Sequence, residues 1–422
     1  MSNIRDLYAL EILDSRGRPT IKTTCTLASG ISASASVPSG RSTGAAEALE
    51  LRDGNPLRYQ GKGCLKAVGH VNTEILNCLK NRDFSSQQEL DGALIALDGT
   101  DNKRNLGANA ILSVSISFAR AVAKEQGQPL YRAFSQLINR KVERFPRLTI
   151  NLFSGGRHAG KQIPIQDVLI VPSSPESIDH SLVMMNNIYQ AAAEIGLKTY
   201  GMRLLTADEG GLAPPFPNAE AMLEAAVTAI SNAGYRPGED AHLALDVAAS
   251  HFYRDGSYYL DETPISSSRM IERLQRWCAD YPIVSIEDGL YEDDWDNWPL
   301  LQEALGSRIL ILGDDLLCTN PSRIDKAIAA GACNALLLKV NQIGTLTEAA
   351  RACRMARDAG WLVTISVRSG ETEDDWAADL AVGWSGDQFK NGSVTQSERL
   401  AKYNRLLEIE NQNPMPIVSW PS

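Results

Sequence analysis

Aromatic residues, paired cysteines and long apolar runs are scarce or missing in this 422-residue sequence. Aromatic side chains make up 6% of it, so the core must be built from Leu, Ile, Val and Ala. The seven cysteines are an odd number without a Cys-x-x-Cys pair, which is typical of a reducing compartment. No apolar run reaches the ~18 residues of a membrane span, and the first residues carry no basic-then-apolar signal. We therefore expect a cytoplasmic protein without a membrane partner.

A surplus of positive charge is missing as well. The sequence has 51 acidic and 41 basic residues, which gives a net charge of −10. Proteins that bind nucleic acids usually carry a basic surplus or a basic stripe, so we expect no nucleic-acid partner. The 44% of hydrophobic and 22% of charged residues exclude a disordered chain, a collagen and a coiled-coil rod. A small anionic substrate remains compatible with this composition if cations or a metal ion gather locally.

The first part of the chain has the pattern of strands followed by helices. Three apolar, Thr-rich or strictly alternating segments, separated by short turns, predict an antiparallel meander. They are residues 4–13, 20–27 and 31–37. Residues 45–135 are mostly helical in pattern, most clearly 107–126, and the basic segment 139–146 ends in proline. We therefore predict an α+β capping domain over residues 1–138 and a second domain over residues 139–422.

The second domain repeats a strand–helix pattern. Short apolar runs recur with helical stretches such as 320–330 and 345–359 between them, and each run ends in a charged residue. The charged ends are Asp246, Glu287, Asp314, Lys339 and Arg368. This repetition favours a closed (β/α)8 barrel of the TIM type, and an open doubly wound sheet is the alternative. The predicted fold is thus α/β, with a C-terminal barrel and an N-terminal α+β cap.

The charged strand ends predict a metal site. In a barrel of this type the carboxyl ends of the strands lie on one rim, so these side chains would converge there. The carboxylates of Asp246, Glu287 and Asp314 would repel one another strongly without a cation. Ligation by oxygen alone favours Mg²⁺ over zinc. The alternative is a structural ion-pair network, to which Lys339 and Arg368 would contribute the cations.

Two residues are candidates for proton transfer. Lys339 follows the apolar run 336–338, and both burial and a nearby dication lower the pKa of a lysine. Such a lysine can act as a general base at neutral pH. Glu209 precedes two glycines, which place its carboxylate on a tight turn and make it a candidate general acid. The alternative for Glu209 is an ordinary acidic loop.

Segments spread over nearly the whole chain resemble those of enolase. They are VPSGRSTG at 37–44, LDGT at 97–100, LGANAIL at 106–112, DEGG at 208–211, ALDVAAS at 244–250, SIEDGL at 285–290, GDDL at 313–316, LKVNQIG at 338–344 and RSGETED at 368–374. The resemblance implies an α+β cap, a catalytic barrel and a homodimer or higher homo-oligomer. It also implies reversible dehydration of 2-phosphoglycerate to phosphoenolpyruvate, with the lysine base and Mg²⁺ known for enolase-superfamily sites.

The resemblance implies a role for each matching residue. Lys339 would take the proton from the α-carbon, and Glu209 would protonate the departing hydroxyl. The ligands implied for one or two Mg²⁺ ions are Asp246, Glu287, Asp314 and, on a mobile loop that closes over the second ion, Ser39. The implied substrate contacts are Arg368 and Ser369 for the phosphate, Lys390 for the carboxylate, and His158 and Gln166 in the lining of the pocket.

Three of the expected substrate contacts depart from the enolase pattern. Val367 replaces a histidine, and loss of a donor in a desolvated site typically costs about 3 kcal/mol of transition-state stabilisation. Asp167 replaces a glutamate and draws its carboxylate back by one methylene, about 1.5 Å. Arg41 replaces an alanine of the lid and adds a permanent cation with several donors. Residues 392–398 also differ from the usual Gly-Ala-Pro-x-Arg-Ser-Glu.

These observations lead to one leading hypothesis and its alternatives. The leading hypothesis is a Mg²⁺-dependent, enolase-type lyase that acts on 2-phosphoglycerate or a close phosphorylated or phosphonate acid. The departures favour a specialised paralogue, such as a carboxyphosphonoenolpyruvate synthase of a phosphonate or phosphinate antibiotic pathway, over a divergent housekeeping enolase. A non-catalytic scaffold or adhesin is the remaining alternative, and the presence of Lys339, Glu209 and the three carboxylates speaks against it.

Overall fold

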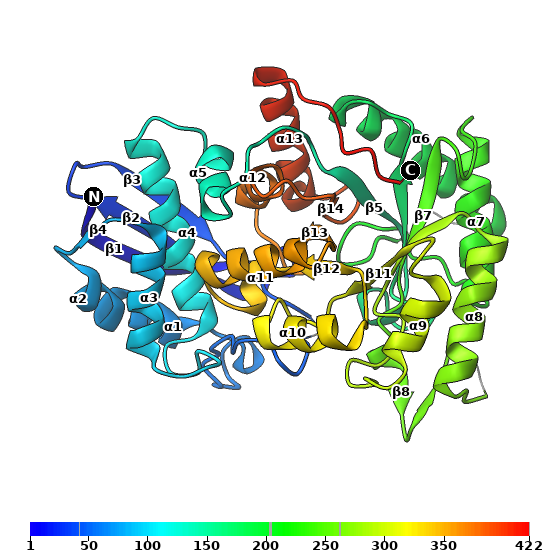
Figure 1. The fold of residues 1–422 in the computed structure, drawn as a ribbon, viewed down its shortest axis with the longest axis horizontal. Helices are drawn as coiled ribbons and strands as arrows, with labels where there is room; N and C mark the ends of the chain where they lie inside the picture. The colour runs from blue at the N-terminus through cyan, green and yellow to red at the C-terminus, as the bar shows by residue number, and fades with distance from the viewer. Residues whose placement is uncertain (42, 202–204, 261–262, 422) are drawn as a thin grey trace.

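Two regions lie side by side in the computed structural model, an N-terminal sheet covered by helices and a C-terminal barrel (Figure 1). The structure describes residues 1–41, 43–201, 205–260 and 263–421. The predicted α/β fold, with a barrel and an N-terminal cap, is confirmed. The predicted domain boundary after residue 138 falls in the connection between helix α5 (Leu130–Leu137) and strand β5 (Arg147–Ser154), and it stays a prediction.

The cap begins with the predicted antiparallel meander. It consists of β1 (Ser2–Leu13), β2 (Pro19–Leu27) and β3 (Ser32–Ser36), in the sheet order β3-β2-β1-β4. The fourth strand, β4 (Asp83–Phe84), pairs with the start of β1. The sequence did not predict β4, because two residues are too short to show a strand pattern.

Helices cover one face of this sheet. They are α1 (Leu65–His70), a π-helical turn (Val71–Ile75), α2 (Leu76–Leu79), α3 (Gln87–Asp98) and α4 (Ala108–Glu125), while α5 packs on α4. Helix α4 packs on β2 and β3 and is buried on most of its surface. The prediction that helical structure begins at residue 45 is wrong for residues 45–64, which are mostly loops. That stretch contains Pro56 and several glycines, which favour turns over helix.

The second domain is a closed eight-stranded barrel. Its strands are β5, β6 (Asp167–Pro172), β7 (Ala241–Asp246), β10 (Ile283–Glu287), β11 (Leu310–Gly313), β12 (Ala335–Leu338), β13 (Leu362–Ser366) and β14 (Gln388–Lys390). Its helices are α6 (Ile178–Tyr200), α7 (Ala219–Asn232), α8 (Ser267–Asp280), α9 (Trp298–Leu305), α10 (Pro321–Ala330), α11 (Leu346–Asp358), α12 (Trp376–Gly383) and α13 (Ser397–Gln412). A small hairpin of β8 (Tyr253–Arg254) and β9 (Ser257–Tyr258) follows β7.

The expectation that the carboxyl ends of all barrel strands share one rim is wrong for β6. This strand runs antiparallel to both β5 and β7, whereas the other neighbouring pairs of the barrel are parallel. The connection from β5 to β6 contains only one short 3-10 turn (Gly156–His158). A parallel neighbour needs a longer crossover, usually a helix, so a short connection makes the pair antiparallel. The amino end of β6, with Asp167, therefore lies at the rim beside Asp246.

The strand alternation determines which side chains enter the barrel. Two small apolar clusters, separate from the main core, contain alternate side chains of β6, β11 and β12 and one side chain each of β7 and β10, and Trp420 of the C-terminal tail packs against both. In β12 these positions are Ala335 and Leu337, and the next position of the same phase is Lys339. The same alternation carries Asp314 inward after β11. The rim of the barrel is thus lined by charged groups above an apolar floor.

Within the described ranges, no helix combines the length and the apolar character that crossing a membrane would need.

Candidate active site

A small cavity of about 30 Å³ lies at the rim of the barrel, and charged side chains line it. The predicted site residues that line it are Arg41, His158, Gln166, Glu209, Asp246, Asp314, Lys339, Val367, Arg368, Ser369 and Lys390. Asp315 and Ser366 also line it and were not predicted. Asp167 and Glu287 do not line the cavity, but they contact the lining residues His158 and Lys390. The side chain of Ser39 makes its hydrogen bonds to Glu50 and Arg52.

Lys390 joins two of the predicted metal ligands. Its Nζ lies 2.7 Å from Oδ2 of Asp246 and 2.6 Å from Oε2 of Glu287, and all three side chains are buried. Gln166 donates a further hydrogen bond of 2.8 Å to Asp246. Burial alone would raise the pKa of Asp246, but Lys390 lowers it to about 2. Burial and the neighbouring Asp246 together raise the pKa of Glu287 well above its usual value. Glu287 is therefore the carboxylate that is least compensated by the protein's own cations.

Lys339 makes an ion pair with the third predicted ligand, Asp314. Gln342 donates a hydrogen bond of 2.8 Å to the other oxygen of Asp314, and we call Asp314, Lys339 and Gln342 the Lys339 wall. The predicted lowering of the lysine pKa included a bound dication and stays a prediction, because the protein groups alone shift the pKa of Lys339 the other way. Burial disfavours the charged amine, but Asp314 and Glu287 outweigh it and raise the pKa of Lys339. If the charges of these carboxylates were neutralised, burial would have the largest effect on the pKa of Lys339 and would lower it.

A second layer of acids supports the predicted ligands, and the sequence analysis missed it. The carboxylate of Asp288 accepts hydrogen bonds from the backbone N–H groups of Asp314 and Asp315, at 2.9 and 2.8 Å. Burial raises the pKa of Asp288 to about 8, and the charge of Asp314 adds to the effect. One oxygen from each of Asp288, Asp314 and Asp315 lies within 4.8 Å of the other two. The sequence signal was present, since an acid directly follows Glu287 and another follows Asp314.

Oxygen donors near the cavity are of the kind that a hard divalent cation takes. Among the described residues, the groups with ligand atoms within 4.8 Å of one another are Asp288, Asp314 and Asp315, and His158, Asp167 and Glu209, so the predicted set of Asp246, Glu287 and Asp314 stays a prediction. Asp246, Glu287 and Asp314 offer three carboxylates, while Lys339 and Lys390 offset only two negative charges. Within the described part of the chain, Oε1 of Glu287 is buried without a hydrogen-bond partner. A buried carboxylate oxygen without a partner is costly unless a cation or a donor satisfies it. Oxygen donors of this kind are the ligands that Mg²⁺ prefers.

On the opposite side lie Glu209 in a loop, His158 in the 3-10 turn between β5 and β6, and Asp167 at the start of β6, which we call the Glu209 wall. Asn151 of β5 donates a hydrogen bond of 3.2 Å to Glu209. Nδ1 of His158 lies 3.9 Å from Glu209 and 3.3 Å from Asp167. Gly210, at φ 85°, allows this turn to pack closely, since an added Cβ would lie 2.6 Å from the Thr395 hydroxyl.

Charges within the Glu209 wall are coupled. Burial disfavours a charged imidazole, but Glu209 and Asp167 outweigh it and raise the pKa of His158. Burial would raise the pKa of Glu209, but His158 and nearby cations lower it. Glu209 is therefore ionised at neutral pH and must take up a proton before it can act as an acid. His158 is a neighbouring cation when protonated, with its Nδ1 3.9 Å from Glu209.

Arg368 and Ser369 follow β13 at the edge of the cavity. Arg368 is buried, and its guanidinium donates to Glu47 at 2.9 Å and to Asn341 at 3.2 Å. The Ser369 hydroxyl accepts a hydrogen bond of 3.0 Å from Arg16 of the cap. A buried guanidinium beside a hydroxyl is a typical recognition site for a phosphate or a related oxyanion. A residue of the cap, Arg16, thus contacts the part of the site that was predicted from the sequence to bind the phosphate.

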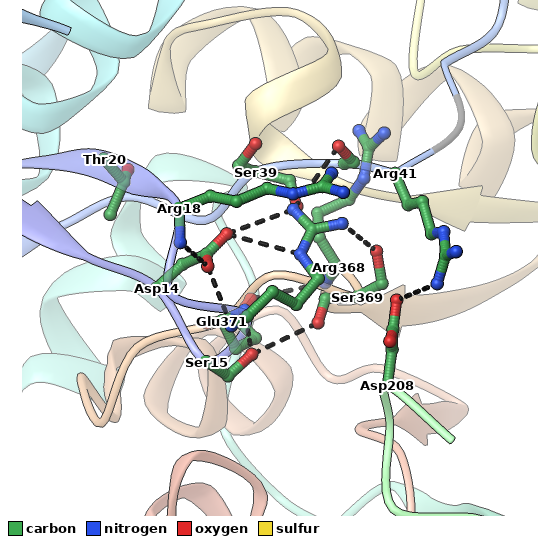
Figure 2. A network of polar contacts seen from close by, with 12 residues as sticks. Asp14, Ser15, Arg18, Thr20, Ser39, Arg41, Asp208, Arg368, Ser369 and Glu371 are labelled. Carbon is green, nitrogen blue, oxygen red and sulfur yellow. Dashed lines mark hydrogen bonds and ion pairs between the residues drawn. The ribbon is translucent and has the colours of Figure 1, made fainter. Parts of the chain in front are cut away.

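The lid loop reaches across the mouth of the cavity. Arg41 makes an ion pair of 2.6 Å with Asp208, which precedes Glu209 (Figure 2). Ser39 is held by paired backbone hydrogen bonds with Gly370, and its hydroxyl donates to Glu50 and accepts from Arg52. The hydroxyl of Ser39 is therefore engaged away from the carboxylates, and its role as a ligand of a second Mg²⁺ stays a prediction.

Comparison with known families agrees with this arrangement. The model of the enolase N-terminal domain matches residues 4–134, and the model of the enolase C-terminal TIM barrel domain matches residues 143–415. The chain belongs to the enolase family. Membership supports an enolase-type lyase in general, and this family typically uses Mg²⁺, for which the acidic clusters at the rim offer ligands.

Proposed function

We propose that this enolase-family protein is a Mg²⁺-dependent lyase that removes the proton α to a carboxylate and eliminates water. Its substrate would be 2-phosphoglycerate or a close anionic analogue. The observation that carries the proposal is that Lys339 and Glu209 line the same small cavity. Lys339 follows β12, and the Glu209 wall rests on β5 and β6, on the opposite side of the eight-stranded ring. A base and an acid on opposite sides of a substrate suit an elimination in which the proton and the leaving group depart from opposite faces.

Each side chain has a distinct task in this proposal. Lys339 removes the α-proton, and Glu209 protonates the departing hydroxyl once it has taken up a proton. Lys390 binds the substrate carboxylate beside Asp246 and Glu287, and Arg368 with Ser369 binds the phosphate. A bound Mg²⁺ would be held by Asp246, Glu287 and Asp314 and would stabilise the charge that develops on the substrate carboxylate. With those carboxylates neutralised, burial would lower the pKa of Lys339 toward the range of a base.

A second candidate is a specialised reaction on a phosphonate-bearing acid, such as the formation of carboxyphosphonoenolpyruvate. Two features of the cavity favour it. Val367 places an alkyl group in a wall of charged residues, and Arg41 adds a cation over the mouth. A substrate must also displace Arg41 or a neighbour, because a cavity of about 30 Å³ holds little more than one water molecule. An additional anionic group on the substrate would compete with Asp208 for Arg41.

A substrate screen with the purified full chain tests both candidates. The protein is incubated with Mg²⁺ and either 2-phosphoglycerate or phosphonate-bearing hydroxy acids, and the enol product is followed by absorbance and ³¹P NMR. Turnover of any of these acids, lost on chelation by EDTA and restored by Mg²⁺, would support the lyase. Faster turnover of the phosphonate acids would favour the specialised reaction, and brisk turnover of 2-phosphoglycerate alone would exclude it. Absence of both turnover and binding would favour a scaffold or adhesin.

A further inference from the structure

A second cavity, of about 370 Å³, lies between two loops beside the candidate active site. One wall is the connection between β5 and β6, around Arg157 and Lys161, and the other runs from His251 to Tyr259. This volume falls at the lower end of the range for small-molecule sites, which is about 300–1,000 Å³. It is an order of magnitude larger than the space of about 30 Å³ between Lys339 and Glu209. The two cavities have different linings, since the larger one contains none of the carboxylates of the active site.

Three cations line this cavity, and none of the described residues that line it is an acid. They are Arg157, Lys161 and Arg254, and within the described residues none of them makes an ion pair or a side-chain hydrogen bond. The guanidinium of Arg254 instead lies 3.9 Å from the centre of the Tyr259 ring. All three cations are exposed, and with no acid among the lining residues the cavity is locally basic in a protein of net charge −10. An anion placed between them would relieve their mutual repulsion.

The remaining walls are uncharged. Phe252 and Tyr253 contribute rings, and Ile163 and Pro164 contribute aliphatic surface. His251 also lines the cavity, and among the described residues its buried Nδ1 has no hydrogen-bond partner. A cavity that combines cations, a free imidazole nitrogen and apolar walls suits a molecule with an anionic end and an uncharged organic part.

The position of the cavity connects it to the active site. Arg157 lines the large cavity, while its neighbour His158, in the same three-residue turn, lines the small one. A ligand that holds Arg157 would therefore also restrict the turn that carries His158. A ligand in the large cavity would therefore restrict His158 in the Glu209 wall, and it would have no contact with the Lys339 wall.

From this geometry we infer that the cavity is a second binding site, for a small organic phosphate whose phosphate group lies between Arg157, Lys161 and Arg254. The uncharged part of the ligand packs against Phe252 and Pro164. The inference does not depend on the proposed lyase activity, because none of these residues belongs to the proton-transfer groups.

The test is a binding titration of the full chain with two probes, phenyl phosphate and inorganic phosphate, by calorimetry in the presence of EDTA. The variants are Lys161→Ala/Arg254→Ala, which removes two of the cations, and Arg5→Ala, which removes an exposed arginine of β1 in the cap. We expect saturable binding of phenyl phosphate to the wild type and a Kd raised about tenfold or more in the double variant. The Kd of Arg5→Ala should equal that of the wild type. Inorganic phosphate should bind about tenfold more weakly than phenyl phosphate, because it lacks the part that contacts the apolar walls.

Three results would overturn the inference. The first is no saturable binding of either probe up to about 10 mM. The second is an unchanged Kd in the double variant, which would place the probe in the active site or elsewhere. The third is equal affinity for the two probes, which would show that the apolar walls do not bind the organic part of the ligand. If the double variant does not fold, as judged by circular dichroism, Lys161→Gln and Arg254→Gln are measured separately with the same criteria.

Discussion

The two walls of the candidate active site differ in how they are built. In the Lys339 wall, Asp314 and Lys339 directly follow neighbouring barrel strands, and Asp314 is held by Lys339, Gln342 and the backbone contact to Asp288. In the Glu209 wall, Glu209 and the turn with His158 lie between strands, and only Asp167 belongs to one. Among the described residues, Nδ1 of His158 and Oδ2 of Asp167 are buried without hydrogen bonds, though 3.3 Å apart. Strand ends in a closed barrel are rigid, whereas loops tolerate change. Under the proposed function, we therefore expect the Glu209 wall to tolerate more substitutions than the Lys339 wall.

The sharpest test of the comparison is removal of the base. Lys339→Ala should lower the rate of α-proton exchange and of product formation by about 10²- to 10⁴-fold, the usual range for a positioned general base. Exchange is measured as loss of the α-proton signal of the substrate in D₂O by ¹H NMR. The matched control is Lys66→Ala, which removes an exposed lysine of the cap and should leave both rates unchanged. Exchange at the wild-type rate in Lys339→Ala would assign proton abstraction to another group.

Substitution of Glu209 should affect elimination but not exchange of the α-proton, and so should distinguish the roles of the two walls. Glu209→Gln keeps the shape of the side chain but cannot deliver a proton, so elimination should fall by about 10²-fold. Exchange of the α-proton should persist, because the Lys339 wall is untouched. Comparison of NMR exchange with ³¹P detection of product gives both rates on one sample, and Glu303→Gln, on the exposed face of α9, serves as the control. An equal loss of exchange and elimination would show that the walls do not act separately.

Val367 tests whether the cavity has changed its substrate. Val367→His restores a ring that can donate a hydrogen bond in a desolvated wall, and we expect about a tenfold gain in turnover of 2-phosphoglycerate. The matched control is Val367→Ile, which changes the volume but adds no donor. Thermal-unfolding curves first establish that the wild type and both variants are folded. Steady-state kcat/KM values of the three proteins are then compared on fresh samples. A gain in the isoleucine variant as well would point to packing rather than to a hydrogen bond.

The smallest effect is expected at the lid. The ion pair between Arg41 and Asp208 is partly exposed, and such pairs typically contribute under 1 kcal/mol. Arg41→Ala should therefore raise KM for an anionic substrate by less than about fivefold and leave kcat nearly unchanged. Arg5→Ala is the control for loss of one positive charge. A fall in kcat that exceeds the change in KM would mean that Arg41 stabilises the transition state rather than only binding the substrate.

Much of the site could be predicted because strand ends leave a local signature. A short apolar run followed by a charged residue places that residue at a rim, and this held for Asp246, Glu287 and Asp314. The reversal of β6 was not predicted, because the sequence of a short strand does not encode its direction, and Asp167 reaches the rim only through that reversal. Asp288 was also missed, since its role is to accept backbone hydrogen bonds from a different strand end.

Local patterns in the chain predicted the strand–helix repeat, a barrel beneath a cap, three carboxylates at strand ends, and candidates for a base and an acid. These follow from periodicity and residue type, which act over a few neighbouring positions. The partners of these groups depend on the folded chain, in which Lys390 lies between Asp246 and Glu287, Arg16 of the cap donates to Ser369, and Arg41 pairs with Asp208. The folded chain also decided the direction of the pKa shift of Lys339, because burial and pairing act in opposite directions and only the actual neighbours determine which one prevails.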